Sequence, residues 1–134
     1  MLKGVIALVL LAHGIGHSMG LVQLFKVATV NPEWHGDSWI LTGPAGTTGT
    51  QVVGAVLWTA AIVGFAAVAA VVIGWLPTSM FAPLAVGSAA VSLLGVLFFP
   101  VAFPTFSTIG AVAVDLAVIV ATVWYHWLPT DLAA

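Results

Sequence analysis

Four long apolar stretches, separated by short polar breaks, make up most of the chain. Each is long enough to cross a bilayer, because an α-helix needs roughly 20 residues to span about 30 Å of hydrocarbon. The stretches cover about residues 3–26, 51–75, 80–99 and 107–127. Proline lies in both breaks that separate the last three stretches, where it ends a helix. The pattern predicts a single all-α membrane domain, residues 1–134, folded as an antiparallel bundle of four transmembrane helices.

The only long polar connection runs from about residue 27 to residue 50. Its Gly, Thr and Pro residues are typical of turns. Tryptophan side chains gather at the headgroup level of bilayers, so we expect Trp34 and Trp39 to lie at the membrane interface, with His35 as a further interfacial residue. Trp75, Trp124 and Trp127, near the ends of other stretches, fit the same aromatic belt.

Composition supports a bilayer location. Hydrophobic residues make up 62% of the chain and charged residues only 4%, whereas a soluble domain carries roughly 25% charged residues. The chain has no arginine and only two lysines, which argues against a nucleic-acid partner, because phosphate binding depends on clustered Lys and Arg. The absence of cysteine excludes disulfides, thiolate metal sites and cysteine nucleophiles.

The first apolar stretch is a retained helix by its pattern. It begins with Lys3, as a signal peptide does, but continues to Phe25 without a clear small-residue cleavage site. With an even number of spans both termini lie on one side. We expect that side to be the cytoplasmic one, in the inner or plasma membrane of a bacterium, although two lysines give the positive-inside rule little to count.

Small residues recur at helical spacing and predict close helix contacts. Ala12, Gly16 and Gly20 form one stripe on the first helix. The other small pairs are Ala60 with Gly64 on the second helix and Ser88 with Ser92 on the third.

Ionisable side chains inside the first and last helices form the candidate site. His13 and His17 lie one turn apart on one face of the first helix, and Asp115 is the only carboxylate within the four spans. Groups of this kind within a membrane usually face the protein interior and mark a function. Counting about 1.5 Å of rise per residue puts Asp115 at the height of His17, with His13 nearer the midplane.

A polar stripe on the last helix extends the candidate site. Steps of seven and eleven residues return almost to the starting angle of an α-helix, so one narrow face carries Thr108, Asp115, Thr122 and His126. His126 should lie near the surface at which the first helix begins.

The cluster of His13, His17 and Asp115 fits several chemistries. A buried His–Asp hydrogen bond can hold two helices together. Two neutral imidazoles and a carboxylate can ligate a transition metal. The same groups can relay protons or serve a quinone-linked site. Haem would need a ligand from another helix, because two histidines on one helix cannot hold opposite faces of one iron.

The motif His13-Gly14-Ile15-Gly16-His17-Ser18-Met19-Gly20 resembles that of small uncharacterised four-helix bacterial membrane proteins with a His-Gly-x-x-His signature in the first span. More distantly, the chain is similar to DoxX-like proteins, on the strength of His13 and Gly14. Those proteins are associated with membrane quinone oxidoreductases, so the resemblance implies a subunit role beside an electron-transfer partner.

These observations predict a small accessory or anchor subunit of a larger membrane assembly, because the chain has almost no aqueous domain in which to catalyse a reaction on its own. One alternative is a metal-, haem- or quinone-linked redox protein that uses His13, His17 and Asp115. Another is an oligomeric transporter or proton-relay protein. The expected partners are the lipid bilayer and either other membrane subunits or further copies of the chain.

Overall fold

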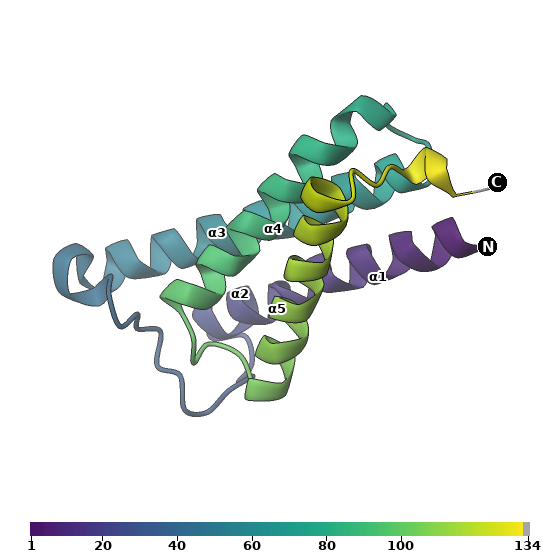
Figure 1. Cartoon of the computed structure of the whole chain (residues 1–134). Coiled ribbons are helices and arrows are strands. Elements are labelled where there is room, and N and C mark those ends of the chain that lie inside the picture. The colour runs from purple at the N-terminus through teal and green to yellow at the C-terminus, as the bar shows by residue number, and fades with distance from the viewer. Residues whose placement is uncertain (133–134) are drawn as a thin grey trace.

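The computed structural model describes residues 1–132 and is helical throughout its spans (Figure 1). The helices are α1 (Leu2–Gly16), α2 (Ser18–Leu24), α3 (Thr42–Val72), η1 (Thr78–Met80), α4 (Phe81–Phe98), α5 (Thr105–Ile119), η2 (Val120–Trp124) and η3 (Pro129–Asp131). Four segments are long and apolar enough to cross a membrane, namely Leu2–Leu24, Thr42–Val72, Thr78–Phe98 and Thr105–Trp124. The predicted all-α, four-span architecture is confirmed.

The second span begins earlier than the pattern predicts. Helix α3 starts at Thr42 instead of near residue 51, because the Gly- and Thr-rich segment is helical on both sides of an interruption at Gly46, where φ is 69° and ψ is 176°. The polar connection is correspondingly shorter and covers residues 25–41.

Helices α1, α3 and α4 pack closely through small residues. A Cβ atom at Gly14 would lie 2.8 Å from the Phe65 Cβ, and one at Gly20 would lie 2.7 Å from the Trp58 ring. Between α3 and α4, Gly64 faces the Ser88 side chain in the same way. These approaches are too short for any side chain larger than hydrogen, so glycine sets the distance between the helices.

The stripe of Ala12, Gly16 and Gly20 is not the contact face that the sequence predicts. Gly20 does contact α3, but Ala12 is exposed and a Cβ atom at Gly16 would meet nothing within 4 Å. Gly14 replaces them because the side of α1 that faces Phe65 is rotated away from the stripe. Spacing alone does not show which of several glycines meets a bulky neighbour.

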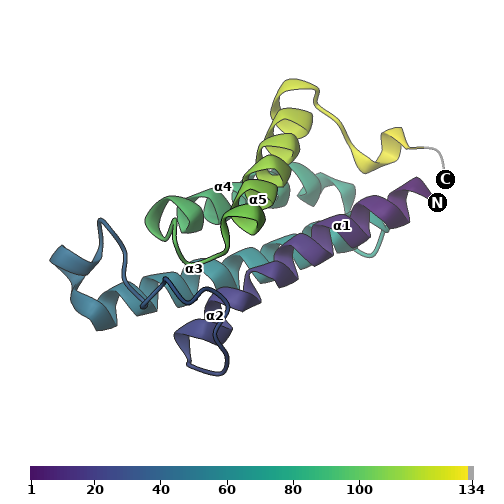
Figure 2. The same cartoon turned by 90° about the horizontal axis from the view of Figure 1, so that it is seen from below.

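Helix α5 crosses the other helices steeply and does not run alongside them (Figures 1 and 2). It packs mainly on α4, and Asp115 is the only buried residue in its α-helical part. Helices that cross at a steep angle meet closely only near the crossing point. Contact between α5 and α1 is therefore limited to the region of the crossing, while α5 and η2 both pack on α4.

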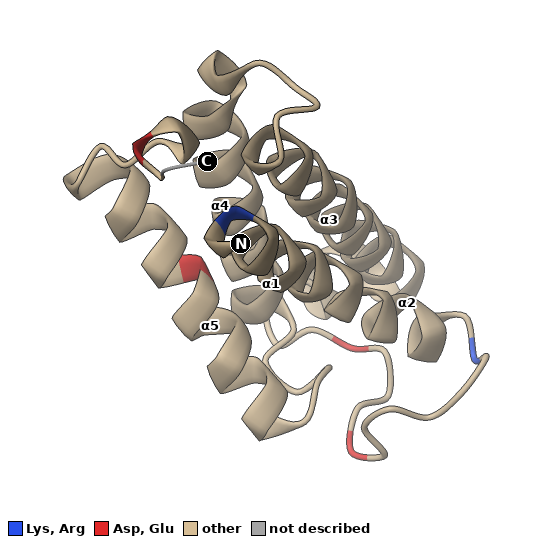
Figure 3. Ribbon diagram, turned by 90° about the vertical axis from the view of Figure 1, so that its right-hand side faces the viewer, with Lys and Arg blue, Asp and Glu red and all other residues tan. Residues whose placement is uncertain are grey.

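Charged positions avoid the interior of the spans with one exception (Figure 3). The acid on α5 is Asp115, and the other charged residues lie near helix ends, in the connection or in η3. The first residues of α1 and the η3 turn lie at the same end of the molecule (Figures 1 and 2), as an even number of spans requires.

The connection between α2 and α3 folds back on the protein. The Gln23 side chain ties it down, because its amide donates to the Asn31 and Trp34 carbonyls and its oxygen accepts from the Val30 and Asn31 amides. Trp34 is buried against Trp58 and is not part of an interfacial belt, contrary to the sequence-based expectation. Its burial follows from this folding back.

The other predicted belt residues have mixed environments. Trp39, Trp75 and Trp124 are exposed at or beyond the helix ends, and His35 is exposed in the connection. Trp127 instead packs its ring against Phe81, with the ring centroids 5.3 Å apart.

Candidate functional site

The two histidines and the aspartate meet where α5 crosses α1 and α4. His13 Nε2 lies 2.8 Å from Asp115 Oδ1. His17 does not touch the carboxylate directly, because Ser92 of α4 lies between them. Its Oγ lies 2.9 Å from His17 Nε2 and donates to Asp115 Oδ2 at 2.5 Å. A continuous chain of hydrogen bonds thus runs from His17 through Ser92 and Asp115 to His13.

All four side chains are withdrawn from the surface. Asp115 is completely buried, Ser92 is 1% exposed and His17 is 4% exposed. The side chain of His13 is 8% exposed. An unpaired polar group costs free energy in such surroundings, so each member depends on the others to satisfy it.

The pairing differs in register from the prediction. The depth estimated from the helical rise per residue puts Asp115 level with His17, whereas in the structure Asp115 contacts His13 directly. The estimate assumes that the first and last helices run parallel to a common axis. Because α5 crosses steeply, position along its sequence does not convert into depth in this way (Figure 1).

Ser92 is the member that sequence reasoning missed. Its spacing from Ser88 predicts a helix-packing role for both serines, and Ser88 does fill that role against Gly64. The signal was available, since a buried serine hydroxyl needs a hydrogen-bond partner. The missing information was that α4 lies between α1 and α5 at this height.

The polar stripe of α5 does not act as one surface. Thr108 lines a cavity beside the two histidines, and Thr122 is buried with its hydroxyl bonded to the Val118 carbonyl at 2.7 Å. His126 is exposed, beyond the last helical turn, with a φ of 50°. The wider turn of η2 (Val120–Trp124) and the left-handed residue that follows it carry His126 off the helical face.

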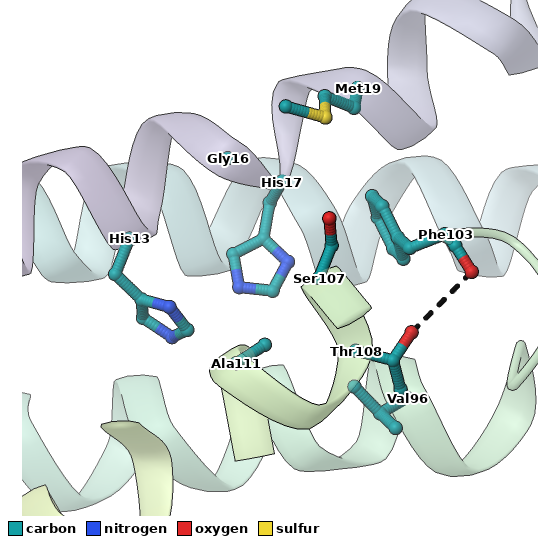
Figure 4. Close-up of a pocket in the computed structure, with 9 residues that line it drawn as sticks. All are labelled: His13, Gly16, His17, Met19, Val96, Phe103, Ser107, Thr108 and Ala111. Carbon is teal, nitrogen blue, oxygen red and sulfur yellow. Dashed lines mark hydrogen bonds between the residues drawn. The ribbon is translucent and has the colours of Figure 1, made fainter. Parts of the chain in front are cut away.

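A cavity of about 180 Å³ opens beside the two imidazoles, between α1, α2, α4 and the first turns of α5 (Figure 4). Figure 4 shows the His17 ring facing Ser107 and Phe103, with the His13 ring beside it. The ring centroids of the two histidines are 5.2 Å apart. The lining residues are His13, Gly16, His17, Met19, Val96, Phe103, Ser107, Thr108 and Ala111.

A second hollow of about 300 Å³ lies on the other side of the crossing point. It is lined by apolar residues of α1 and the later turns of α5, among them Leu10, Val118 and Ala121. The two hollows lie on either side of the crossing, where Asp115 of α5 meets His13 of α1. Of these two hollows, only the one beside the histidines has members of the buried hydrogen-bonded chain among its lining residues.

The structure does not support the predicted metal site of His13, His17 and Asp115. Within residues 1–132, no group of three His, Cys, Asp or Glu side chains is placed to hold a metal ion. The reason is local, since the Nε2 atoms of both histidines are directed at hydrogen-bond partners and Ser92 separates His17 from the carboxylate.

Comparison with known proteins adds no family to this picture. No family model, no curated protein and no solved structure matches the chain.

Proposed function

We propose that the protein binds a small lipid-soluble molecule in the cavity beside His17 and exchanges protons with it through the buried side-chain network. The observation that carries this proposal is the hydrogen-bonded chain His17–Ser92–Asp115–His13, whose two terminal imidazoles both line one cavity.

The network has the components of a proton relay. Imidazole can take up a proton at one ring nitrogen and release one from the other. A proton that enters at His17 Nδ1 can therefore leave His17 Nε2 for Ser92 Oγ, while the hydroxyl proton of Ser92 passes to Asp115 Oδ2. The donor–acceptor separations along this path are 2.9 and 2.5 Å, both within hydrogen-bond range. Each transfer needs only a shift along an existing hydrogen bond.

The cavity position suits a ligand that arrives from the bilayer. It lies between segments apolar and long enough to span a membrane, and its walls include Met19, Val96 and Ala111. Small-molecule sites typically combine apolar walls with a few placed polar groups. Here the imidazole of His17 and the hydroxyls of Ser107 and Thr108 are the polar groups.

Infrared difference spectroscopy tests whether the network exchanges protons or only holds helices together. Spectra of the protein in lipid, recorded between acidic and neutral pH, should contain a carboxyl C=O band that is lost in Asp115→Asn and shifted in Ser92→Ala. The matched control is Asp37→Asn in the exposed connection, which should retain the band. A carboxyl group that never changes protonation while the protein stays folded would contradict the proposal and leave a purely structural role.

The accessory-subunit role and the quinone-linked role stay predictions. Co-purification of other chains with the protein in mild detergent would support the subunit role, and a functional protein isolated alone would contradict it.

A further inference from the structure

The positions of the protons in the network determine what the cavity can recognise. An ionised carboxylate only accepts hydrogen bonds, and Asp115 has a potential donor at each oxygen. Ser92 has a single hydroxyl proton, which it gives to Asp115, so its oxygen must accept from His17 Nε2–H. His13 likewise uses its Nε2–H for Asp115.

A neutral imidazole carries one N–H, so this arrangement leaves Nδ1 of each histidine with a lone pair. Figure 4 shows one ring nitrogen of His17 directed toward Ser107. Because Nε2 is bound to Ser92, this nitrogen is Nδ1, and it is a hydrogen-bond acceptor. This nitrogen prefers a ligand group that donates a hydrogen bond. An ether or a carbonyl oxygen is itself an acceptor, so its lone pairs would repel the lone pair of the nitrogen.

The size and walls of the cavity restrict the rest of the ligand. A dry protein cavity of roughly 150 Å³ holds one benzene ring, so about 180 Å³ accommodates a single substituted ring. Phe103 offers an aromatic wall and Met19 a thioether, both of which make favourable contacts with an aromatic ring. The hydroxyl of Ser107, on the same cavity wall, can donate to the ligand oxygen.

We propose that the cavity binds lipid-soluble phenols, with the phenolic O–H donating to His17 Nδ1 and the ring lying between Phe103 and Met19. This inference rests on the proposed function and specifies the chemical class of its ligand.

The test compares para-cresol with its methyl ether, which has a similar shape and no donor. Nitrogen NMR spectra of histidine-labelled protein in lipid nanodiscs report binding at His17, and His35 in the exposed connection is the internal control. Para-cresol should shift the His17 Nδ1 resonance. The ether should bind about tenfold more weakly, because it lacks one buried hydrogen bond.

Two variants separate the causes. Ala111→Leu should block both probes by filling the cavity, since Ala111 lines it without joining the hydrogen-bonded chain. Ser92→Ala frees His17 to adopt the other tautomer and should reduce the preference for the phenol over the ether.

Equal binding of the two probes, tighter binding of the ether, or no response of His17 to either would overturn the phenol assignment. The infrared titration of Asp115 is measured without either probe. Its result therefore tests the proton-exchange proposal independently of the phenol assignment.

Discussion

Helices α3 and α5 are both apolar and long enough to span a membrane, but they are held in different ways. In the most apolar 18 residues of α3, 39% of the residues are buried, against 11% in the most apolar 18 residues of the segment Thr105–Trp124. Helix α3 packs on α1 and α4 along its length through glycine contacts, whereas α5 meets α1 at the polar crossing around Asp115. Close packing joins α1, α3 and α4, whereas α5 packs mainly on α4 and meets α1 through the hydrogen-bonded network.

This difference explains where the cavities lie. Shape complementarity along a helix leaves no space for a ligand, and the first span is in close contact with α3 at Gly14 of α1 and Gly20 of α2. A helix held at one crossing point leaves space on each side of it. A functional site can form beside α5 because little of α5 is used for packing.

The largest expected effect comes from removing the crossing contact. Asp115→Ala should destabilise the protein by about 2–6 kcal/mol, because it leaves His13 and Ser92 buried without their partner, at roughly 1–3 kcal/mol each. Thermal or detergent-induced unfolding in lipid measures the loss. Asp37→Ala, in the exposed connection, is the control and should be close to neutral. A similar loss of unfolding free energy in both variants would show that the contact at the crossing contributes no more to stability than an exposed residue does.

A smaller effect is expected in the closely packed region. Gly20→Ala places a Cβ atom 2.7 Å from the Trp58 ring, which is confined by Trp34, Phe99 and Phe103. Overpacking of this kind should cost about 1–3 kcal/mol.

Gly16→Ala is the matched control for Gly20→Ala in the same span, since a Cβ atom there meets nothing within 4 Å. The two unfolding midpoints should differ clearly, with Gly20→Ala the less stable. Equal midpoints would show that α2 and α3 are less closely packed at Trp58 than in the structure.

Ser92→Ala should have a modest effect on stability, of about 1 kcal/mol, because the His13–Asp115 contact remains in place. Its effect on the site should be large, since the path from His17 to Asp115 is interrupted. Unfolding midpoints and the Asp115 infrared band, measured on one sample, separate the two effects. A variant that unfolds as readily as Asp115→Ala would make Ser92 a structural residue.

The smallest effect is expected on the outer face of α5. Phe106 is 89% exposed, so Phe106→Ala should change the unfolding free energy by no more than about 0.5 kcal/mol. Unfolding in lipid, with Phe65→Ala as the contrasting buried variant, measures the difference. Strong destabilisation by Phe106→Ala would mean that this face is covered by another chain in the membrane.

The sequence predicts the spans well because bilayer thickness imposes a length on every apolar stretch. It also identifies His13, His17 and Asp115, since ionisable residues within a span are rare enough to stand out. The register of their contacts was not predictable, because it depends on the steep crossing of α5. No local pattern in residues 105–124 encodes that angle.

Two further features depend on three-dimensional neighbours. Ser92 becomes part of the site only because α4 lies between α1 and α5 there, and Trp34 is buried only because the connection folds over Trp58. Taken alone, a serine at helical spacing and a tryptophan in a polar loop indicate packing and an interface. Both residues are buried because segments distant in the sequence pack against them.

The central claim is that Asp115 orders both histidines through Nε2 and leaves Nδ1 of His17 available to the cavity. Nitrogen NMR of the four histidines in lipid, assigned by single substitutions, tests it directly. We expect His13 and His17 to be neutral and in the Nε2–H form, and Ser92→Ala to disturb His17 while His13 keeps its tautomer. An Nδ1–H form at His17, or tautomer mixtures at both residues like those of exposed His35, would contradict the account.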